Sequence, residues 1–164
     1  MTKTRARALY IAYAAMIAAI YAALTIVLQP ISYGIMQIRV SEALSVLPYF
    51  TGSAVPGLFI GCLVANIVGG NGLVDVIVGS LATLAAAICA RFIKIKWLVP
   101  LPSVLINAVL VGGELYFILE TSYSLPVVML LVGAGQLIAC YVVGLPLMLL
   151  LERFRRKLFP EGLR

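Results

Sequence analysis

The sequence predicts an all-α fold, a six-helix transmembrane bundle made by one domain over residues 1–164, with both termini in the cytoplasm. Two observations predict this class. Apolar residues make up 63% of the chain and charged residues 11%, with a mean hydropathy of +1.13, whereas soluble domains carry about a quarter charged residues. The basic residues gather in short clusters at the ends of apolar runs, which indicates membrane topology and not a nucleic-acid-binding surface.

The first apolar run, residues 8–28, is the clearest membrane span. As a helix it would be roughly 30 Å long, enough to cross a bilayer. Lys3, Arg5 and Arg7 precede it, so a cleaved signal peptide is the alternative. The run is longer than a usual signal core, and the later charges agree with retention, so we expect a membrane helix.

The other helices follow from the basic clusters, which lie at residues 3–7, 91–96 and 153–157. If all three clusters are cytoplasmic, an even number of crossings separates each pair. The stretch before residue 69 must then form two helices, and "TGSAVPG" at residues 51–57 is suited to the break between them. The six expected helices cover approximately residues 8–28, 41–52, 54–69, 72–92, 97–119 and 124–157. The second would be only roughly 18 Å long, too short to span a bilayer of ordinary thickness.

This topology places the intramembrane polar residues in the outer half of the membrane, around the octet "QIRVSEAL" at residues 37–44 and the later helices. Such residues are costly in lipid and mark functional sites. Their grouping indicates a pocket open to the outside and not a pore. Glu114 lies seven residues after Asn107 on the same helix face, beside Gly112 and Gly113, which leave room for a ligand or a neighbouring helix. Gln136 would lie on the next helix, as a pocket residue or as an interhelical hydrogen-bonding group.

A structural role is the alternative to ligand binding for several of these polar residues. Glu114 would balance the charge of Arg39 in one alternative. Asp75 would be stabilised by the dipole at a helix N-terminus that Asn71 caps. Arg39 and Glu42 are three residues apart and would pair on one helix face, which would hold the first external loop as a lid.

The first expected helix carries two interleaved series of small residues spaced by four. One series is Ala14, Ala18 and Ala22, and the other is Ala15, Ala19 and Ala23. Such spacing lets another helix approach closely, either inside the bundle or from a second protein. Because the two series together cover most of the helix circumference, we expect a second protein to dock there.

Enzyme and metal chemistry have no support in the sequence. The chain contains no histidine, so it cannot form a Ser–His pair or a Cys/His metal site, and its three cysteines stand singly in apolar runs. It also has no phosphate-binding loop of the G-x-x-x-x-G-K-[ST] type. We therefore expect no catalytic residue, no metal and no cofactor. No inverted repeat is visible, which weakens the case for a carrier that works alone.

The stretches "QIRVSEALSVLPYF" and "NIVGGNGLVDVIVGS" resemble the queuosine-precursor transporter (QueT) family, which is among the S components of energy-coupling factor (ECF) transporters. The resemblance implies capture of a substrate outside the cell membrane. It also implies docking through the first helix onto a transmembrane coupling protein, with two ATPase subunits driving uptake. The pocket residues that the resemblance implies for this chain are Arg39, Glu42, Asn71, Asp75, Asn107 and Glu114.

The implied substrate is a 7-deazaguanine base such as queuine, preQ0 or preQ1. Its guanine-like edge presents two adjacent N–H donors and a carbonyl group, which Glu114 with Asn107 or Gln136 would match. Tyr33 or Tyr116 would stack on the ring.

A cationic, aminomethyl-bearing precursor would gain from a second carboxylate, either Asp75 or Glu42. Two alternatives stay open: an S component for another vitamin, and a self-sufficient small secondary carrier or channel. The second alternative would need polar groups that continue into the inner half of the membrane.

Overall fold

The computed structural model of the protein describes residues 3–35, 37–70, 72–119 and 121–159, and these residues form helices and no strand. The prediction of an all-α chain is therefore confirmed. The helical elements are α1 (Lys3–Val27), α2 (Gln29–Ser32), η1 (Val40–Tyr49), α3 (Ala54–Gly69), α4 (Leu73–Phe92), η2 (Lys96–Leu98), α5 (Leu101–Ile118), α6 (Leu125–Leu137), η3 (Ile138–Gly144), α7 (Leu145–Arg153) and α8 (Arg155–Leu158).

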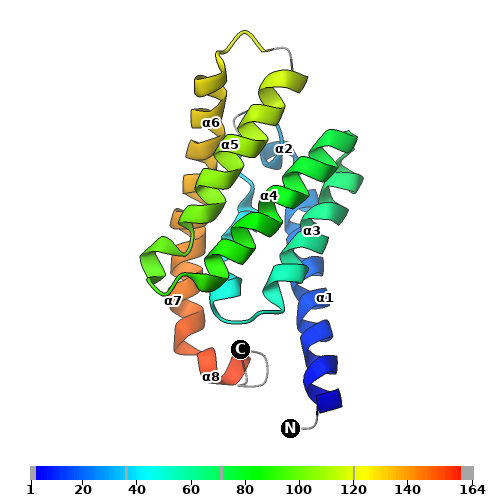
Figure 1. The fold of residues 1–164 in the computed structure, drawn as a ribbon, viewed down its shortest axis with the longest axis vertical. Coiled ribbons are helices and arrows are strands. Elements are labelled where there is room, and N and C mark those ends of the chain that lie inside the picture. The colour runs from blue at the N-terminus through cyan, green and yellow to red at the C-terminus, as the bar shows by residue number, and fades with distance from the viewer. Residues whose placement is uncertain (1–2, 36, 71, 120, 160–164) are drawn as a thin grey trace.

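The long helices lie along the long axis of the molecule, and η1 is enclosed among them. Helix α3 packs between α1 and α4, and α5 packs between α4 and α6 (Figure 1). Behind α4, η1 contacts α1, α3, α4 and η3. Most of its side chains, including those of Glu42, Val46 and Pro48, are buried. Just before this enclosed segment, Gln37 and Arg39 are buried inside the bundle.

Element η1 differs from the prediction of a short α-helix over residues 41–52. It is a ten-residue 3₁₀ helix with Pro48 inside it. A 3₁₀ helix rises about 2.0 Å per residue, so ten residues extend about 20 Å. Because Pro48 has no N–H group, it cannot complete a regular α-helical hydrogen-bond ladder there.

Four helical segments of the described chain are long and apolar enough to cross a membrane. They are Lys3–Val27, Leu73–Phe92, Lys96–Ile118 and Leu125–Arg153. Large apolar side chains on their outer faces are exposed, for example Leu73 at 80% and Leu130 at 72%, as expected for surfaces in contact with lipid. The protein is thus a multi-pass membrane protein.

The expected count of six spanning helices is not confirmed, because α3 is a shorter apolar helix and η1 is shorter still. The single helix expected over residues 124–157 is also divided. It passes from α6 through the π-helical turn of η3 into α7, and it breaks at Phe154 before the short α8.

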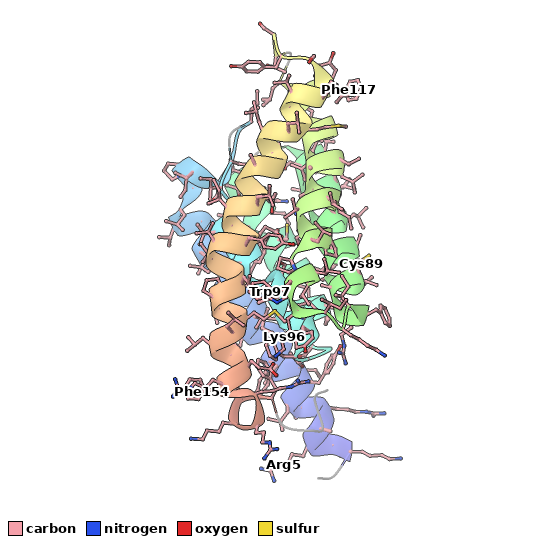
Figure 2. The ribbon with its side chains drawn as sticks, turned by 90° about the vertical axis from the view of Figure 1, so that its left-hand side faces the viewer. Arg5, Cys89, Lys96, Trp97, Phe117 and Phe154 are labelled. Atoms are coloured by element: carbon pink, nitrogen blue, oxygen red, sulfur yellow. The ribbon has the colours of Figure 1, made fainter. Side chains whose placement is uncertain are left out.

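The three basic clusters lie at one end of the bundle, which we call the basic end. Figure 2 shows Arg5 and Phe154 there and Phe117 at the opposite end, which we call the pocket end. An ion pair of 3.4 Å between Lys96 Nζ and Glu152 Oε1 connects the second cluster to α7. The hydroxyl of Tyr13 on α1 donates to the carbonyl of residue 158, at 2.7 Å, so α1 and α8 meet at this end.

The two alanine series of α1 have different surroundings. Helix α3 presents Gly57 and Gly61 to α1, and a Cβ atom on either glycine would lie 2.8 Å from the carbonyl oxygen of Ala14 or Ala18. The series Ala14, Ala18 and Ala22 therefore packs inside the chain, and Ala18 and Ala22 are buried. The series Ala15, Ala19 and Ala23 is exposed. The first series thus faces the glycines of α3 within the chain. Docking of a second protein on this helix stays a prediction.

Candidate functional site

A cavity of about 160 Å³ opens at the pocket end of the bundle. The loop between α2 and η1, the first turn of α4 and the last turns of α5 form its wall. The lining residues are Tyr33, Gly34, Gln37, Arg39, Asp75, Glu114, Leu115, Ile118 and Leu119. Charged and polar groups thus face a partly apolar chamber.

Two contacts hold the loop between α2 and η1 against the neighbouring helices α3 and α6. Gly34 has φ +100°, a left-handed conformation that favours glycine. The hydroxyl of Tyr33 donates to the carbonyl of Ala65 on α3, at 2.9 Å. On α6, Gly135 lies so near the loop that a Cβ atom would overlap the carbonyl oxygen of Gln37. These contacts fix Tyr33 against α3 and Gln37 against α6.

We expect Gly135→Ala to destabilise the protein by about 1–3 kcal/mol, the usual cost of inserting a methyl group where no space exists. Gly113→Ala is the matched control, because its Cβ would lie 3.7 Å from Met129 Cε, an ordinary contact. Both changes replace a helical glycine, so any gain in helix propensity is shared. Thermal unfolding of the two detergent-purified variants measures the difference, and equal melting temperatures would contradict the loop contact.

Arg39 is buried at the wall of the cavity, at the N-terminal boundary of η1. Its guanidinium carbon lies 5.4 Å from the centre of the Tyr33 ring, a cation–π geometry. Its Nη1 atom lies 3.8 Å from Cys62 Sγ. Nearby, Gly79 makes room for the side-chain amide of Asn66, since a Cβ atom there would be 2.8 Å from Asn66 Nδ2. Among the described residues, neither of the two ion pairs includes Arg39, so the expected pairing with Glu42 is not observed.

Glu42 lies in the core behind the cavity and not on its wall. The hydroxyls of Tyr21 and Thr83 both donate to its Oε1 atom, the second at 3.2 Å. These bonds connect η1 to α1 and α4. Glu42 is therefore not a lining residue of this cavity, and two hydroxyl groups on flanking helices hold its carboxylate inside the bundle.

Two carboxylates reach the cavity from adjacent helices. Asp75 stands in the first turn of α4, where the helix dipole favours a negative charge. The Asn66 amide donates to the Asp75 carbonyl at 3.0 Å, which fixes this turn against α3. Glu114 on α5 is 8% exposed, and neither of its oxygens has a hydrogen-bond partner within the described chain. A buried carboxylate without donors is costly, so Glu114 is suited to accept hydrogen bonds from a bound molecule.

Four of the eight predicted binding residues line the cavity: Tyr33, Arg39, Asp75 and Glu114. Glu42, Asn107 and Gln136 are buried but do not line it. Gln136 instead accepts a weak hydrogen bond from Cys140 Sγ, at 3.7 Å. Asn71 lies outside the described residues.

Gln37 is a lining residue that the sequence reasoning missed. Its buried Oε1 atom has no hydrogen-bond partner among the residues described. Its position in the sequence could have indicated this role, because Gln37 begins the "QIRVSEAL" octet and lies two residues before Arg39.

Gly112, expected to leave space near Glu114, allows close packing of α5 against α6. A Cβ atom at Gly112 would be 2.8 Å from Met129 Cα on α6.

The fold and this cavity define a small multi-pass membrane protein with a polar, ligand-sized pocket at one end of its bundle. The chain belongs to the QueT transporter family, whose model matches residues 11–153. It is 43% identical over 72 residues to the queuosine precursor transporter QueT of Lactococcus lactis subsp. cremoris (strain MG1363). That alignment covers 43% of this chain and 42% of the relative, so it spans less than half of the relative's length. No solved structure matches the chain.

Proposed function

We propose that the protein is the substrate-binding S component of an ECF transporter and captures a 7-deazaguanine base outside the cell membrane. The observation that carries this proposal is the cavity with Arg39, Asp75 and Glu114 on its wall, at the end of the bundle opposite the basic clusters. Membership in a transporter family and the name of the Lactococcus relative support the substrate class.

The lining groups match the functional groups of such a base. Its guanine-like edge presents two adjacent N–H donors, and Glu114 offers two buried oxygens without partners. Gln37 and Arg39 supply donors for the ring carbonyl, and Tyr33 with the apolar wall contacts the ring face. A cavity of about 150 Å³ holds one benzene molecule, so a bicyclic base would fill this one and extend into its mouth.

Calorimetry on the detergent-purified protein tests the substrate class. We expect 7-deazaguanine to bind, and 7-deazahypoxanthine, which lacks the exocyclic amino group, to bind at least about tenfold more weakly, since a partner for Glu114 is lost. Mass spectrometry of the molecule that copurifies with the protein gives an independent identification. Binding of riboflavin or a pterin, with no binding of deazaguanines, would instead identify an S component for another vitamin.

The exposed series on α1 is the proposed contact with the transmembrane coupling protein. Ala15, Ala19 and Ala23 form a smooth stripe on the side of α1 away from α3. Small side chains let a partner helix approach closely within the bilayer. Because the sequence has no phosphate-binding loop, the energy for uptake is proposed to come from the two ATPase subunits.

The proposed orientation places both termini and the basic end in the cytoplasm, following the distribution of Lys and Arg. The test of this orientation uses a variant without Cys89, the one exposed cysteine, so that the maleimide labels only the introduced cysteine. We expect Ile95→Cys, at the basic end, to react with a membrane-impermeant maleimide only after cells are permeabilised. Tyr123→Cys, in the loop at the pocket end, should react in intact cells. The reverse pattern would contradict the orientation.

A further inference from the structure

An apolar groove of about 240 Å³ lies on the side of the bundle, away from the cavity at the pocket end. Helix α1 contributes residues 13, 16, 17 and 20 to its lining, and α7 contributes residues 147 and 151. Leu44 and Leu47 of η1, which contacts both helices, complete this part of the groove. From residue 13 to residue 20 the groove follows α1 for roughly 10 Å. Its lining suits a hydrocarbon chain that lies along α1.

The groove uses a face of α1 that belongs to neither alanine series. Residues three and four apart share a helix face, so positions 13, 16, 17 and 20 form a third face, beside the one packed on α3 and the exposed stripe. On this face Met16 is 51% exposed and Ile20 is 45% exposed. Within a bilayer, either a lipid chain or an apolar segment of another protein would cover such side chains.

The groove reaches the basic end of the bundle. Leu158 and Phe159, which belong to its lining, directly follow the basic cluster at residues 153–157. The hydrogen bond from the Tyr13 hydroxyl to the Leu158 carbonyl, 2.7 Å long, holds α8 beside the groove. A second concave surface, of about 340 Å³, is formed by residues 152–157. An apolar groove and a basic surface therefore adjoin at the end of α7.

The positive charge of this basic surface is in excess. Glu152 pairs with Lys96 and with Arg155, each at 3.4 Å. Arg153, Arg156 and Lys157 are exposed, and neither of the two ion pairs of the described chain includes them. Residues 152–164 contain five basic residues against two acidic ones, and Arg5 of α1 lies at the same end of the bundle (Figure 2). The surface thus attracts an anion.

We propose that the apolar groove and the basic surface together bind one anionic phospholipid, with an acyl chain along α1 and the phosphate at Arg156 and Lys157. Clusters of Lys and Arg at the ends of membrane helices attract anionic headgroups, and guanidinium and ammonium groups form charge-assisted hydrogen bonds with phosphate. Charge decides between the two possible occupants, because an apolar protein segment would fill the groove and leave the basic surface without an anion. This site is separate from substrate capture and does not depend on it.

The experiment compares two lipids with the same acyl chains, palmitoyl-oleoyl phosphatidylglycerol and palmitoyl-oleoyl phosphatidylcholine. Native mass spectrometry of the detergent-purified full chain measures the fraction of protein that retains each lipid. We expect phosphatidylglycerol to bind at least about tenfold more tightly, since each basic side chain near an anionic headgroup contributes about fivefold and the ammonium of phosphatidylcholine cancels its phosphate charge.

Two charge variants locate the headgroup. Arg156→Gln/Lys157→Gln should weaken phosphatidylglycerol binding by at least about tenfold and change phosphatidylcholine binding by less than about threefold. Lys3→Gln/Lys94→Gln removes the same number of charges from the other two basic clusters and should leave both affinities within about threefold. Equal weakening by the two variants would show a general attraction to the basic end and would overturn the site.

Two tryptophan variants of α7 locate the acyl chain. Leu147→Trp fills the groove and should weaken the binding of both lipids. Leu150→Trp is the matched control on the same helix, because Leu150 is 56% exposed and does not line the groove. We expect its lipid binding to equal that of the wild-type protein, and thermal unfolding verifies that both variants fold.

Three results would overturn the proposal. The first is equal affinity of the wild-type protein for the two lipids, a comparison that needs no variant. The second is unchanged lipid binding in folded Leu147→Trp. The third is a Leu147→Trp variant that retains phosphatidylglycerol but no longer associates with the proposed coupling protein, which would assign the groove to a protein contact.

Discussion

Glu114→Gln is expected to weaken the binding of a 7-deazaguanine base by at least about tenfold. The change keeps the size of the side chain but replaces one acceptor with a donor that faces the N–H groups of the ligand. Loss of a charged hydrogen-bond partner in a buried site costs about 1.5–3 kcal/mol, and 1.4 kcal/mol corresponds to a factor of ten. Glu114 has both oxygens free inside the cavity, so no contact within the described protein offsets this loss. Calorimetry on the purified variant measures the change.

The control separates ligand recognition from charge balance with Arg39, which lines the same cavity. If Glu114 served only to neutralise Arg39, the double variant Arg39→Gln/Glu114→Gln would recover both stability and affinity. If Glu114 forms hydrogen bonds with the base, the double variant can regain stability but still binds the ligand poorly. Restored ligand affinity in the double variant would contradict the proposal that Glu114 contacts the base. The structure favours recognition, because the described chain shows no ion pair between these two residues.

Ala19→Leu is expected to abolish transport and to leave ligand binding by the solitary protein unchanged. Ala19 is on the exposed stripe of α1, so a leucine there meets lipid in the isolated protein and blocks close approach of the coupling protein. The matched control is Ala18→Leu, one residue away. Ala18 is buried against Gly61 of α3, so a larger side chain there should destabilise the protein by about 1–3 kcal/mol.

Two assays measure these effects: uptake in cells that express the complete transporter, and thermal unfolding with calorimetry on each purified variant. Normal uptake by Ala19→Leu would contradict docking through this stripe. Loss of folding in both variants to the same degree would show that the whole ladder serves internal packing.

Much of the fold could be predicted because the membrane restricts backbone structure so strongly. A chain with this mean hydropathy must satisfy its backbone hydrogen bonds within its own segments, and helices do so. The cost of burying charge also made Arg39, Asp75 and Glu114 stand out in apolar surroundings, and all three line the cavity. These predictions depend on composition and on the position of each residue along its own helix, which the sequence contains.

The neighbours of each helix face were decided by tertiary packing. Asn107 and Glu114 share one face of α5, yet only Glu114 reaches the cavity, since the cavity extends along the last turns of the helix alone. Gln37 enters the wall because Gly135 lets its carbonyl approach α6.

The sequence by itself determined that this protein is an all-helical membrane protein with costly buried carboxylates and an arginine. Tertiary structure alone decided which of them share a cavity, and which alanine series of α1 stays exposed. Which alanine series is buried depends on Gly57 and Gly61, which are four residues apart on α3 and match the spacing of Ala14 and Ala18. Both series have the same spacing on α1, so only the partner helix distinguishes them. The physical reason is that periodicity specifies a face of a helix, whereas the contact of that face depends on another helix far away in the chain.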